Sequence, residues 1–143
     1  MNYKAINFRK EIQSISPIFA LKAKTKKLQW YCQIDELIPK EFNTDPRRLK
    51  QILMNLISNS FKFTFKGYVK LKASFMKIED KEAIKFSIID TGLGIKKKDQ
   101  KNLFTLFNTY SISKVNQAGT GIGLYQSYKL AKILGFKNDQ RGI

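Results

Sequence analysis

Three short segments carry side chains that could together bind a nucleotide. One has two asparagines and a lysine at helical spacing, one reads Asp-Thr-Gly-Leu-Gly, and one is glycine-rich; they occupy residues 55–62, 90–94 and 119–124. Amide oxygens and an ammonium suit a phosphate chain with Mg²⁺, and free backbone amides at a helix N-terminus bind phosphate. Each segment alone is a weak signal, whereas all three in this order and at these separations favour a nucleotide pocket.

The first segment is expected to lie on a helix. At about 100° per residue, Asn55, Asn59 and Lys62 share a narrow stripe with Arg48 and Gln51. We expect this stripe to lie beside the apolar face of the helix, as the floor of a cleft would. An ordinary solvated helix face is the alternative, because asparagine and lysine are common on surfaces.

The second segment follows a predicted strand over residues 84–89. Asp90 is in phase with the apolar residues of that strand, so its carboxylate is expected to point inward. A buried carboxylate is costly without a partner, and the exocyclic amine of adenine is a suitable donor. Gly92 and Gly94 would let the backbone turn tightly and a flat ring approach. An ordinary Asp-Thr-Gly turn is the alternative.

The third segment places Gly119, Gly121 and Gly123 before a predicted helix. No lysine follows the last glycine, which departs from the P-loop, and no clear strand precedes the segment, which departs from the dinucleotide fingerprint. Between the second and third segments, a long stretch without clear periodicity is typical of a lid or loop. Phe104 and Phe107 in that stretch are interpreted as its hydrophobic anchor.

Hydrophobic periodicity predicts the elements that would position these residues. They are helices over 9–24, 46–63 and 119–134, a short helix near 99–107, a strand over 28–34, and a hairpin of strands 68–78 and 83–90 joined by a polar turn at 79–82. Thr44, Asp45 and Pro46 form a helix start, with a capping side chain followed by proline in the first turn. Pro17 is expected to kink the first helix or to begin a new turn there.

The composition fits one globular domain of 143 residues with 43% hydrophobic residues. No apolar run is long enough to span a bilayer, and the N-terminus has no signal-peptide layout. The net charge of +16 is spread along the chain, so a solvated lysine-rich surface is favoured over a nucleic-acid partner, which remains an alternative. Histidine is absent and Cys32 is the single cysteine, read as a buried thiol in a reducing compartment. These counts exclude histidine-based acid–base chemistry and argue against zinc.

Together these residues resemble the catalytic, ATP-binding domain of sensor histidine kinases, from the superfamily that includes gyrase, heat-shock chaperones and mismatch-repair ATPases. Residues 45–64 are similar to its asparagine box, 90–95 to the first glycine box, 103–107 to the phenylalanine box and 119–124 to the second glycine box. The resemblance covers residues 5–135. It implies an α/β (α+β) two-layer sandwich of the Bergerat type. A mixed, mostly antiparallel sheet would be covered on one face by about three helices, with ATP under a mobile lid.

The resemblance also implies roles for individual residues. Asn59 looks like the Mg²⁺ ligand, Asn55 a phosphate-side partner, Lys62 a phosphate contact and Asp90 the adenine anchor. The other expected ATP-binding residues are Gly92, Gly94, Ile95, Phe104, Phe107, Gly119, Thr120, Gly121, Gly123 and Leu124. Hydrolytic members of the superfamily carry glutamate where this chain has Asn55, and an amide cannot act as a general base. The sequence therefore resembles the protein-histidine kinase branch.

We expect residues 1–143 to be a single ATP-binding kinase domain without the family's last sheet hairpin, its phosphoacceptor and dimerisation helices, or a receiver domain. The expected partners are a histidine-bearing dimerisation domain of a larger, hybrid two-component kinase and a downstream response-regulator receiver domain. No nucleic acid and no membrane contact are expected for this segment. The expected location is the cytoplasm, with a parent kinase that can be membrane-anchored. The alternative function is a truncated, non-catalytic nucleotide-binding or docking module.

Overall fold

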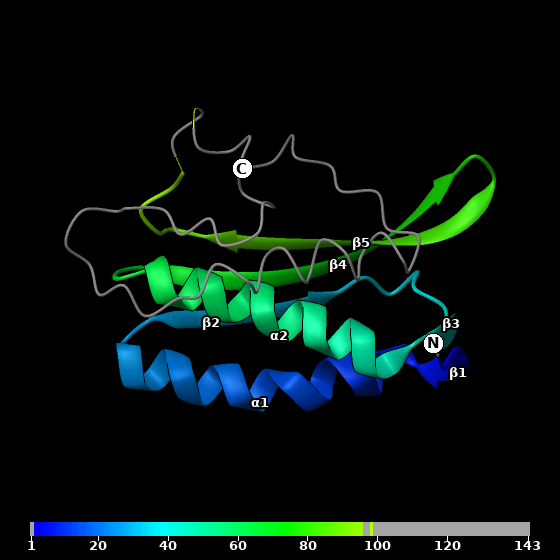
Figure 1. Ribbon diagram of the computed structural model, residues 1–143, viewed down its shortest axis with the longest axis horizontal. Coiled ribbons are helices and arrows are strands. Elements are labelled where there is room, and N and C mark those ends of the chain that lie inside the picture. Colours follow the sequence, from blue (N-terminus) through cyan, green and yellow to red (C-terminus); the bar gives the residue numbers. More distant parts are fainter. Residues whose placement is uncertain (1, 96–97, 99–143) are drawn as a thin grey trace. The chain divides into compact units, whose positions relative to one another are not determined.

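The computed structural model describes residues 2–95 and 98, and the contacts discussed below lie within residues 2–93, which form one compact unit (Figure 1). This unit contains five strands and two helices. They are β1 (Lys4–Asn7), α1 (Phe8–Lys26), β2 (Gln29–Ile34), β3 (Glu41–Thr44), α2 (Pro46–Phe63), β4 (Tyr68–Ile78) and β5 (Lys81–Asp90). None of the helices in this described part is long and apolar enough to cross a bilayer.

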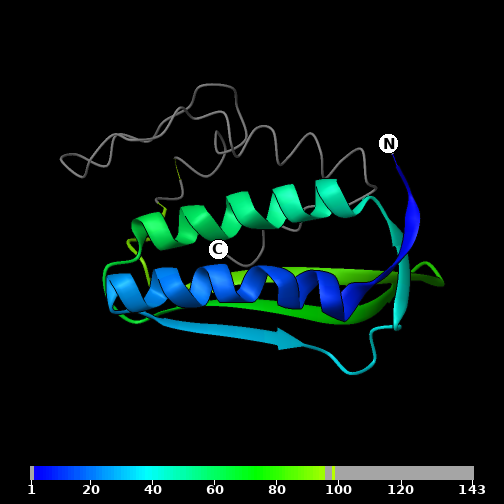
Figure 2. The same ribbon diagram turned by 90° about the horizontal axis from the view of Figure 1, so that it is seen from below.

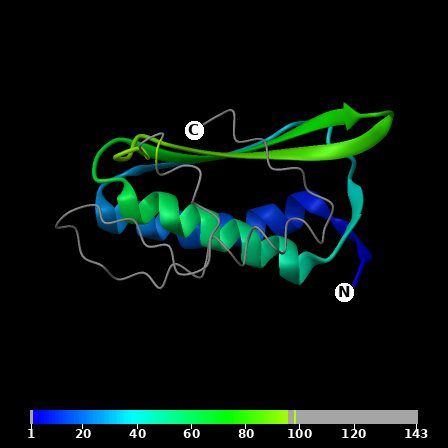
Figure 3. The ribbon, with the colours of Figure 1, turned by 45° about the horizontal axis from the view of Figure 1, so that its top comes forward.

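The strands form two sheets. A three-stranded sheet has the order β2-β4-β5, with β2 parallel to β4 and β4 antiparallel to β5; β1 and β3 pair separately and antiparallel. Both described helices lie on one face of the three-stranded sheet, as Figures 1 and 3 show from two directions. The predicted mixed sheet with helices on one face is therefore confirmed. The third predicted helix, over 119–134, lies outside the described residues.

Helix α2 begins where its sequence predicts. Asp45 Oδ1 accepts hydrogen bonds from the backbone N–H groups of Arg47 and Arg48, at 3.2 and 3.3 Å. These are donors that the first turn of a helix cannot satisfy internally. Pro46 occupies the first turn, where its missing N–H costs nothing. The apolar stripe then turns toward α1 and the sheet; its buried members are Leu49, Ile52, Leu53, Ile57 and Phe61.

Helix α1 runs through Pro17 as one α-helix, so no new helix begins there, and the alternative of a kink at Pro17 stays a prediction. Proline removes one hydrogen bond from a helix interior. Pro17 and Gln13, whose carbonyl loses that bond, are both exposed, so water can take its place. At the N-terminus of α1, the Asn7 side chain accepts from the Lys10 N–H at 3.1 Å. At its C-terminus, Lys27 is the cap residue and has a left-handed conformation with φ 56°. In Figure 2, α1 and α2 lie alongside each other in front of the sheet.

The β4–β5 hairpin is confirmed, with a tighter turn than predicted. Only Glu79 and Asp80 lie outside the strands, with φ of 50° and 62°, as the favoured two-residue hairpin turn requires. Lys81 already pairs with Ile78. On the helix-facing side of β4, Val69, Leu71 and Ala73 are fully buried.

Aromatic rings join the two helices to the sheet. Phe19 of α1 stacks on Phe61 of α2 with ring centroids 5.6 Å apart, and Trp30 of β2 lies tilted against both, at 5.4 and 5.9 Å. Cys32 of the same strand is half-buried rather than fully buried, and burial raises the pKa of its thiol. The cluster fixes the C-terminal half of α2 against β2, which matters because the candidate site lies at that end of the helix.

Candidate nucleotide-binding site

The end of α2 is bonded to the loop that follows β5. Leu93 N–H donates to the Phe63 carbonyl at 3.2 Å, and Gly92 N–H donates to Asp90 Oδ1 at 2.9 Å. A Cβ added to Gly92 would lie 2.6 Å from the Phe63 carbonyl oxygen, 2.8 Å from Asp90 Oδ1 and 2.9 Å from Thr64 Oγ1. Real Cβ atoms essentially never approach so closely, so the glycine is what lets the loop rest on the helix end.

Asp90 lies where the strand phase predicts, but it is not buried. Its ladder partner Val69 is fully buried, which places both residues on the helix side of the sheet. Asp90 itself is exposed, so the expectation of a buried carboxylate is wrong. The physical reason is its position as the last residue of β5, next to the end of α2 rather than under its side. The carboxylate needs no buried partner and is open to a hydrogen-bond donor from outside.

The asparagine stripe approaches this loop along α2. Asn59 lies one helical turn before Phe63, about 6 Å along the axis. Asn55 lies one turn earlier, and both asparagines are half-buried, as is Lys62. The Lys62 ammonium lies 5.3 Å from the centroid of the Phe63 ring. The structure therefore brings Asn59, Lys62 and Asp90 to one end of α2.

The other two members of the predicted stripe do not belong to this end. Arg48 and Gln51 lie near the start of α2 and are exposed. The Arg48 guanidinium donates to Gln51 Oε1 at 3.2 Å. For these two residues the ordinary solvated helix face is the better description.

The last carbonyls of α2 are used by three different donors. The Ser60 carbonyl accepts from the Thr64 hydroxyl at 2.7 Å, the Phe61 carbonyl from the Lys26 ammonium, and the Phe63 carbonyl from Leu93 N–H. Burial, followed by the charge of Lys22, lowers the pKa of Lys26. A cation at a helix C-terminus also offsets the negative end of the helix dipole. These bonds hold the helix end on which the Asp90 loop rests.

Sequence reasoning missed the other side of this loop. Thr91 Oγ1 accepts from the Tyr68 N–H at 2.9 Å and donates to the Lys66 carbonyl at 2.8 Å. Gly67 lies directly against it with φ 98°, a conformation that favours glycine. The available signals were a glycine between helix and strand, and a threonine within Asp-Thr-Gly.

The remaining predicted residues divide into two groups. Gly94 is described and has φ 70°, consistent with a tight turn, and Ile95 is half-buried. The others lie outside the described residues: Phe104, Phe107, Gly119, Thr120, Gly121, Gly123 and Leu124. The lid over 95–118 is, apart from Ile95 and Lys98, equally outside them.

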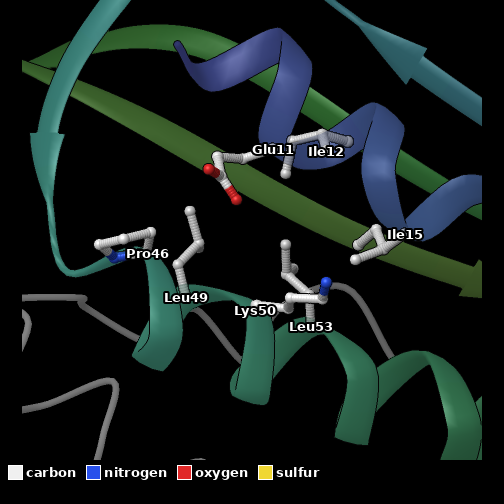
Figure 4. A pocket seen from close by; sticks show the side chains of 7 residues that line it. All are labelled: Glu11, Ile12, Ile15, Pro46, Leu49, Lys50 and Leu53. Carbon is white, nitrogen blue, oxygen red and sulfur yellow. The ribbon is translucent and has the colours of Figure 1, made fainter. Parts of the chain in front are cut away.

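Two surface hollows in the described part of the chain contain none of the predicted site residues. One is a seam between α1 and α2 (Figure 4), lined by Glu11, Ile12, Ile15, Pro46, Leu49, Lys50 and Leu53. Figure 4 shows its leucines and isoleucines facing one another across the two helices, as in ordinary helix packing. The other is lined by residues 33–35 and 72–74 of the sheet.

Comparison with known proteins shows which family the chain is similar to. Residues 44–139 match the family described as histidine kinase-, DNA gyrase B- and HSP90-like ATPase. The aerobic respiration control sensor protein ArcB homolog of Haemophilus influenzae is 34% identical over 135 residues, which cover 94% of this chain and 40% of the relative. The sensor histidine kinase GacS of Pseudomonas protegens is 37% identical over 131 residues, covering 90% of this chain and 14% of the relative.

The fold is also that of a solved structure. Full-length ShkA in complex with AMPPNP aligns with a TM-score of 0.78 and 26% identity, over 94% of this chain and 27% of that one. The chain thus spans less than half the length of each of these three proteins. Since the family match spans most of the chain and the relatives are histidine kinases, the chain belongs to the family of histidine kinase-, DNA gyrase B- and HSP90-like ATPases, as a histidine-kinase catalytic domain.

Proposed function

We propose that this chain binds ATP with Mg²⁺ and, within a larger two-component sensor kinase, transfers the γ-phosphoryl group to a histidine on a separate domain. One observation carries the proposal. An open carboxylate, Asp90, is held by Gly92 N–H beside the end of α2, and the half-buried Asn59 lies one helical turn before Phe63, the last residue of that helix. This arrangement supports the proposal that Asp90 accepts from the base and Asn59 binds the metal of one nucleotide.

The chemistry of these groups suits the two ends of ATP. The Asp90 carboxylate can accept a hydrogen bond from the adenine amine, with its orientation fixed by the Gly92 amide. The amide oxygen of Asn59 is a hard ligand of the kind that Mg²⁺ accepts alongside phosphate oxygens and water. Lys62 adds positive charge near the same turn. When bound, Mg²⁺ would neutralise charge on the phosphates, and catalysis would consist mainly of positioning and electrostatics.

The acceptor would come from outside this chain. Asn55 occupies the position at which hydrolytic members of the superfamily carry a glutamate, and its amide cannot activate water. The sequence contains no histidine. We therefore propose a histidine-bearing dimerisation domain of a hybrid parent kinase as the acceptor, and a receiver domain as the next partner. The need for ATP and for these partners supports a cytoplasmic location, and we propose that residues 1–143 act as one domain.

Calorimetric titration tests the binding step. A non-hydrolysable ATP analogue is titrated with and without Mg²⁺ into the wild-type chain and into Asp90→Asn. We expect saturable binding that Mg²⁺ strengthens and that Asp90→Asn reduces by about a hundredfold, because a hydrogen bond to a charged group is lost. Asp80→Asn is the matched control, since Asp80 lies in the β4–β5 turn. No binding by a folded wild-type chain would refute the proposal.

The transfer step needs a separate assay. The chain is mixed with labelled ATP and with a histidine-bearing dimerisation domain from one of its relatives, and phosphohistidine is measured. Phosphohistidine that disappears with Asp90→Asn supports a kinase. Tight nucleotide binding without phosphohistidine would favour a non-catalytic nucleotide-binding or docking module instead.

A further inference from the structure

We propose that Thr91 is a positioning residue that sets the base selectivity of the site by fixing the direction of the Asp90 carboxylate. The inference rests on the proposed function, since it concerns the same nucleotide site. It assigns a role to a side chain that would not itself touch the nucleotide. Three observations support it: an unusual end to the β4–β5 ladder, a glycine packed against the threonine hydroxyl, and a bond on the far side of Asp90.

The hydroxyl of Thr91 replaces a main-chain carbonyl in the ladder. Thr91 N–H donates to the Tyr68 carbonyl at 3.1 Å, which is half of an ordinary antiparallel pair. In the regular pattern the Tyr68 N–H would donate back to the Thr91 carbonyl. Here it donates to Thr91 Oγ1 instead, at 2.9 Å. The ladder thus keeps its last donor satisfied while the main chain is free to turn away at Thr91.

The bridge is held in place by its neighbours. The Thr91 hydroxyl donates to the Lys66 carbonyl at 2.8 Å, so it both donates and accepts a hydrogen bond. A Cβ on Gly67 would lie 2.1 Å from Thr91 Oγ1, which leaves no room for a side chain there. The Gly67 carbonyl also accepts a hydrogen bond from Gln29 N–H of β2, at 2.9 Å. The position of the hydroxyl is therefore tied to two neighbouring strands.

Asp90 lies between two fixed points as a result. The first is the β4–β5 ladder, in which Asp90 pairs with Val69. After Asp90, the Thr91 bridge stops the strand end from fraying, and Gly92 N–H fixes Asp90 Oδ1. A carboxylate in a fixed direction accepts from the 6-amino group of adenine, whereas the 6-oxo group of hypoxanthine is an acceptor and is rejected. Rejection of this kind depends on the geometry of the polar groups, so a loosened strand end should lose it.

The test compares ADP and IDP, which differ in the six-position group of the base and share the diphosphate. Both are titrated with Mg²⁺ into the full chain. We expect Thr91→Val to weaken ADP binding about tenfold while IDP binding changes less than about twofold. Thr91→Ser keeps the hydroxyl and should keep the wild-type ratio. Thr25→Val is the matched control, because the hydroxyl of the exposed Thr25 donates within α1, to the Leu21 carbonyl at 3.1 Å.

The outcomes separate this inference from the proposed function. If the wild-type chain binds neither nucleotide, the proposed function fails and the inference fails with it. If the wild-type chain prefers ADP but Thr91→Val shows the same ratio as Thr25→Val, only the inference is overturned. Equal wild-type affinities for ADP and IDP also overturn it. Circular dichroism checks folding, and Thr91→Ala repeats the measurement if the valine variant does not fold.

Discussion

An aspartate lies beside each end of helix α2: Asp45 caps its start, and Asp90, the last residue of β5, lies next to its end. The two have opposite roles. Asp45 precedes the helix, is 5% exposed, and accepts three backbone N–H groups: those of Asn2, Arg47 and Arg48. Asp90 lies next to the last turn and is exposed. Among the described residues it accepts one backbone bond, from Gly92. The carboxylate at the start of the helix is committed to the fold, while the one at the end keeps acceptor capacity for a ligand.

The helix dipole sharpens this contrast. A negative side chain is favourable at the N-terminus of a helix and unfavourable at the C-terminus. Asp45 therefore contributes to stability through both its hydrogen bonds and its charge. Asp90 lies near the negative end, where its charge has no such benefit to the fold. Asp90 is nevertheless held in place by Gly92 N–H, which suits a group that binds a ligand. We therefore expect changes at Asp45 to lower stability and changes at Asp90 to lower nucleotide binding.

The largest effect is expected for Gly92→Ala, which would disrupt the contact between the Asp90 loop and the end of α2. The added methyl would meet the Phe63 carbonyl at 2.6 Å, and a backbone atom cannot move aside as a side-chain end can. We expect a loss of roughly 2–3 kcal/mol in the free energy of unfolding, typical of overpacking, and loss of nucleotide binding. Urea unfolding and calorimetry measure the two effects. A fully stable variant with wild-type affinity would show that the loop does not need to rest on α2.

The paired variants Asp90→Asn and Asp45→Asn test the comparison directly. Asp90→Asn should weaken binding of the ATP analogue about a hundredfold without lowering the urea midpoint. Asp45→Asn should lower the midpoint, because an amide NH₂ cannot accept the Asn2 N–H, and leave affinity unchanged. If both variants lost stability, or both lost binding, the division between the two ends would be wrong.

A smaller effect is expected from Thr64→Val at the helix end. The Thr64 side chain is fully buried, and its hydroxyl donates to the Ser60 carbonyl at 2.7 Å. The near-isosteric valine removes that bond, which should cost about 1 kcal/mol of unfolding free energy. Thr25→Val removes a similar bond at an exposed position of α1 and should cost less. If urea unfolding gave equal losses for the two variants, burial of Thr64 would not increase the contribution of its hydrogen bond to stability.

The smallest effect is expected for the pH dependence of stability that comes from Asp45. Its contribution to the free energy of unfolding changes little near neutral pH and is lost in acid. Hydrogen bonds from the backbone amide of Asn2, and then from those of Arg48 and Arg47, hold the pKa of Asp45 below its ordinary value of 3.8. The stability from this group is therefore complete above pH 3.8 and is lost as the pH falls through the lowered folded-state pKa. Backbone bonds from Leu37 and Phe75 lower the pKa of Asp35 in the same way.

Acid titration of the urea midpoint measures this dependence. The wild-type chain should lose stability below about pH 4, and Asp45→Asn should lose less over the same interval because one titrating group is gone. The Asp35 contribution remains in both chains and sets the residual slope. Identical acid profiles for the two chains would mean that Asp45 does not take part in the linkage.

Much of this arrangement was readable from the sequence because local signals agreed. Asp45-Pro46 marks the start of α2, and alternating residues mark β4 and β5. Strands β1 and β3 were missed since four residues are too few to show alternation. The exposure of Asp90 was missed because strand phase gives a direction but not the point at which the covering helix ends. The Thr91 bridge depends on residues 66–68, a contact that spacing along the chain does not reveal.

The aromatic cluster in the core provides an optical reporter of this region. Trp30 is the single tryptophan of the chain, and its indole N–H donates to Ser16 at 2.9 Å. Its ring lies against Phe61, in the part of α2 whose carbonyls hold the Asp90 loop. All tryptophan fluorescence therefore arises from one place behind the candidate site. A shift in its emission wavelength on adding nucleotide would report movement of the helix end, in the unlabelled chain and in solution.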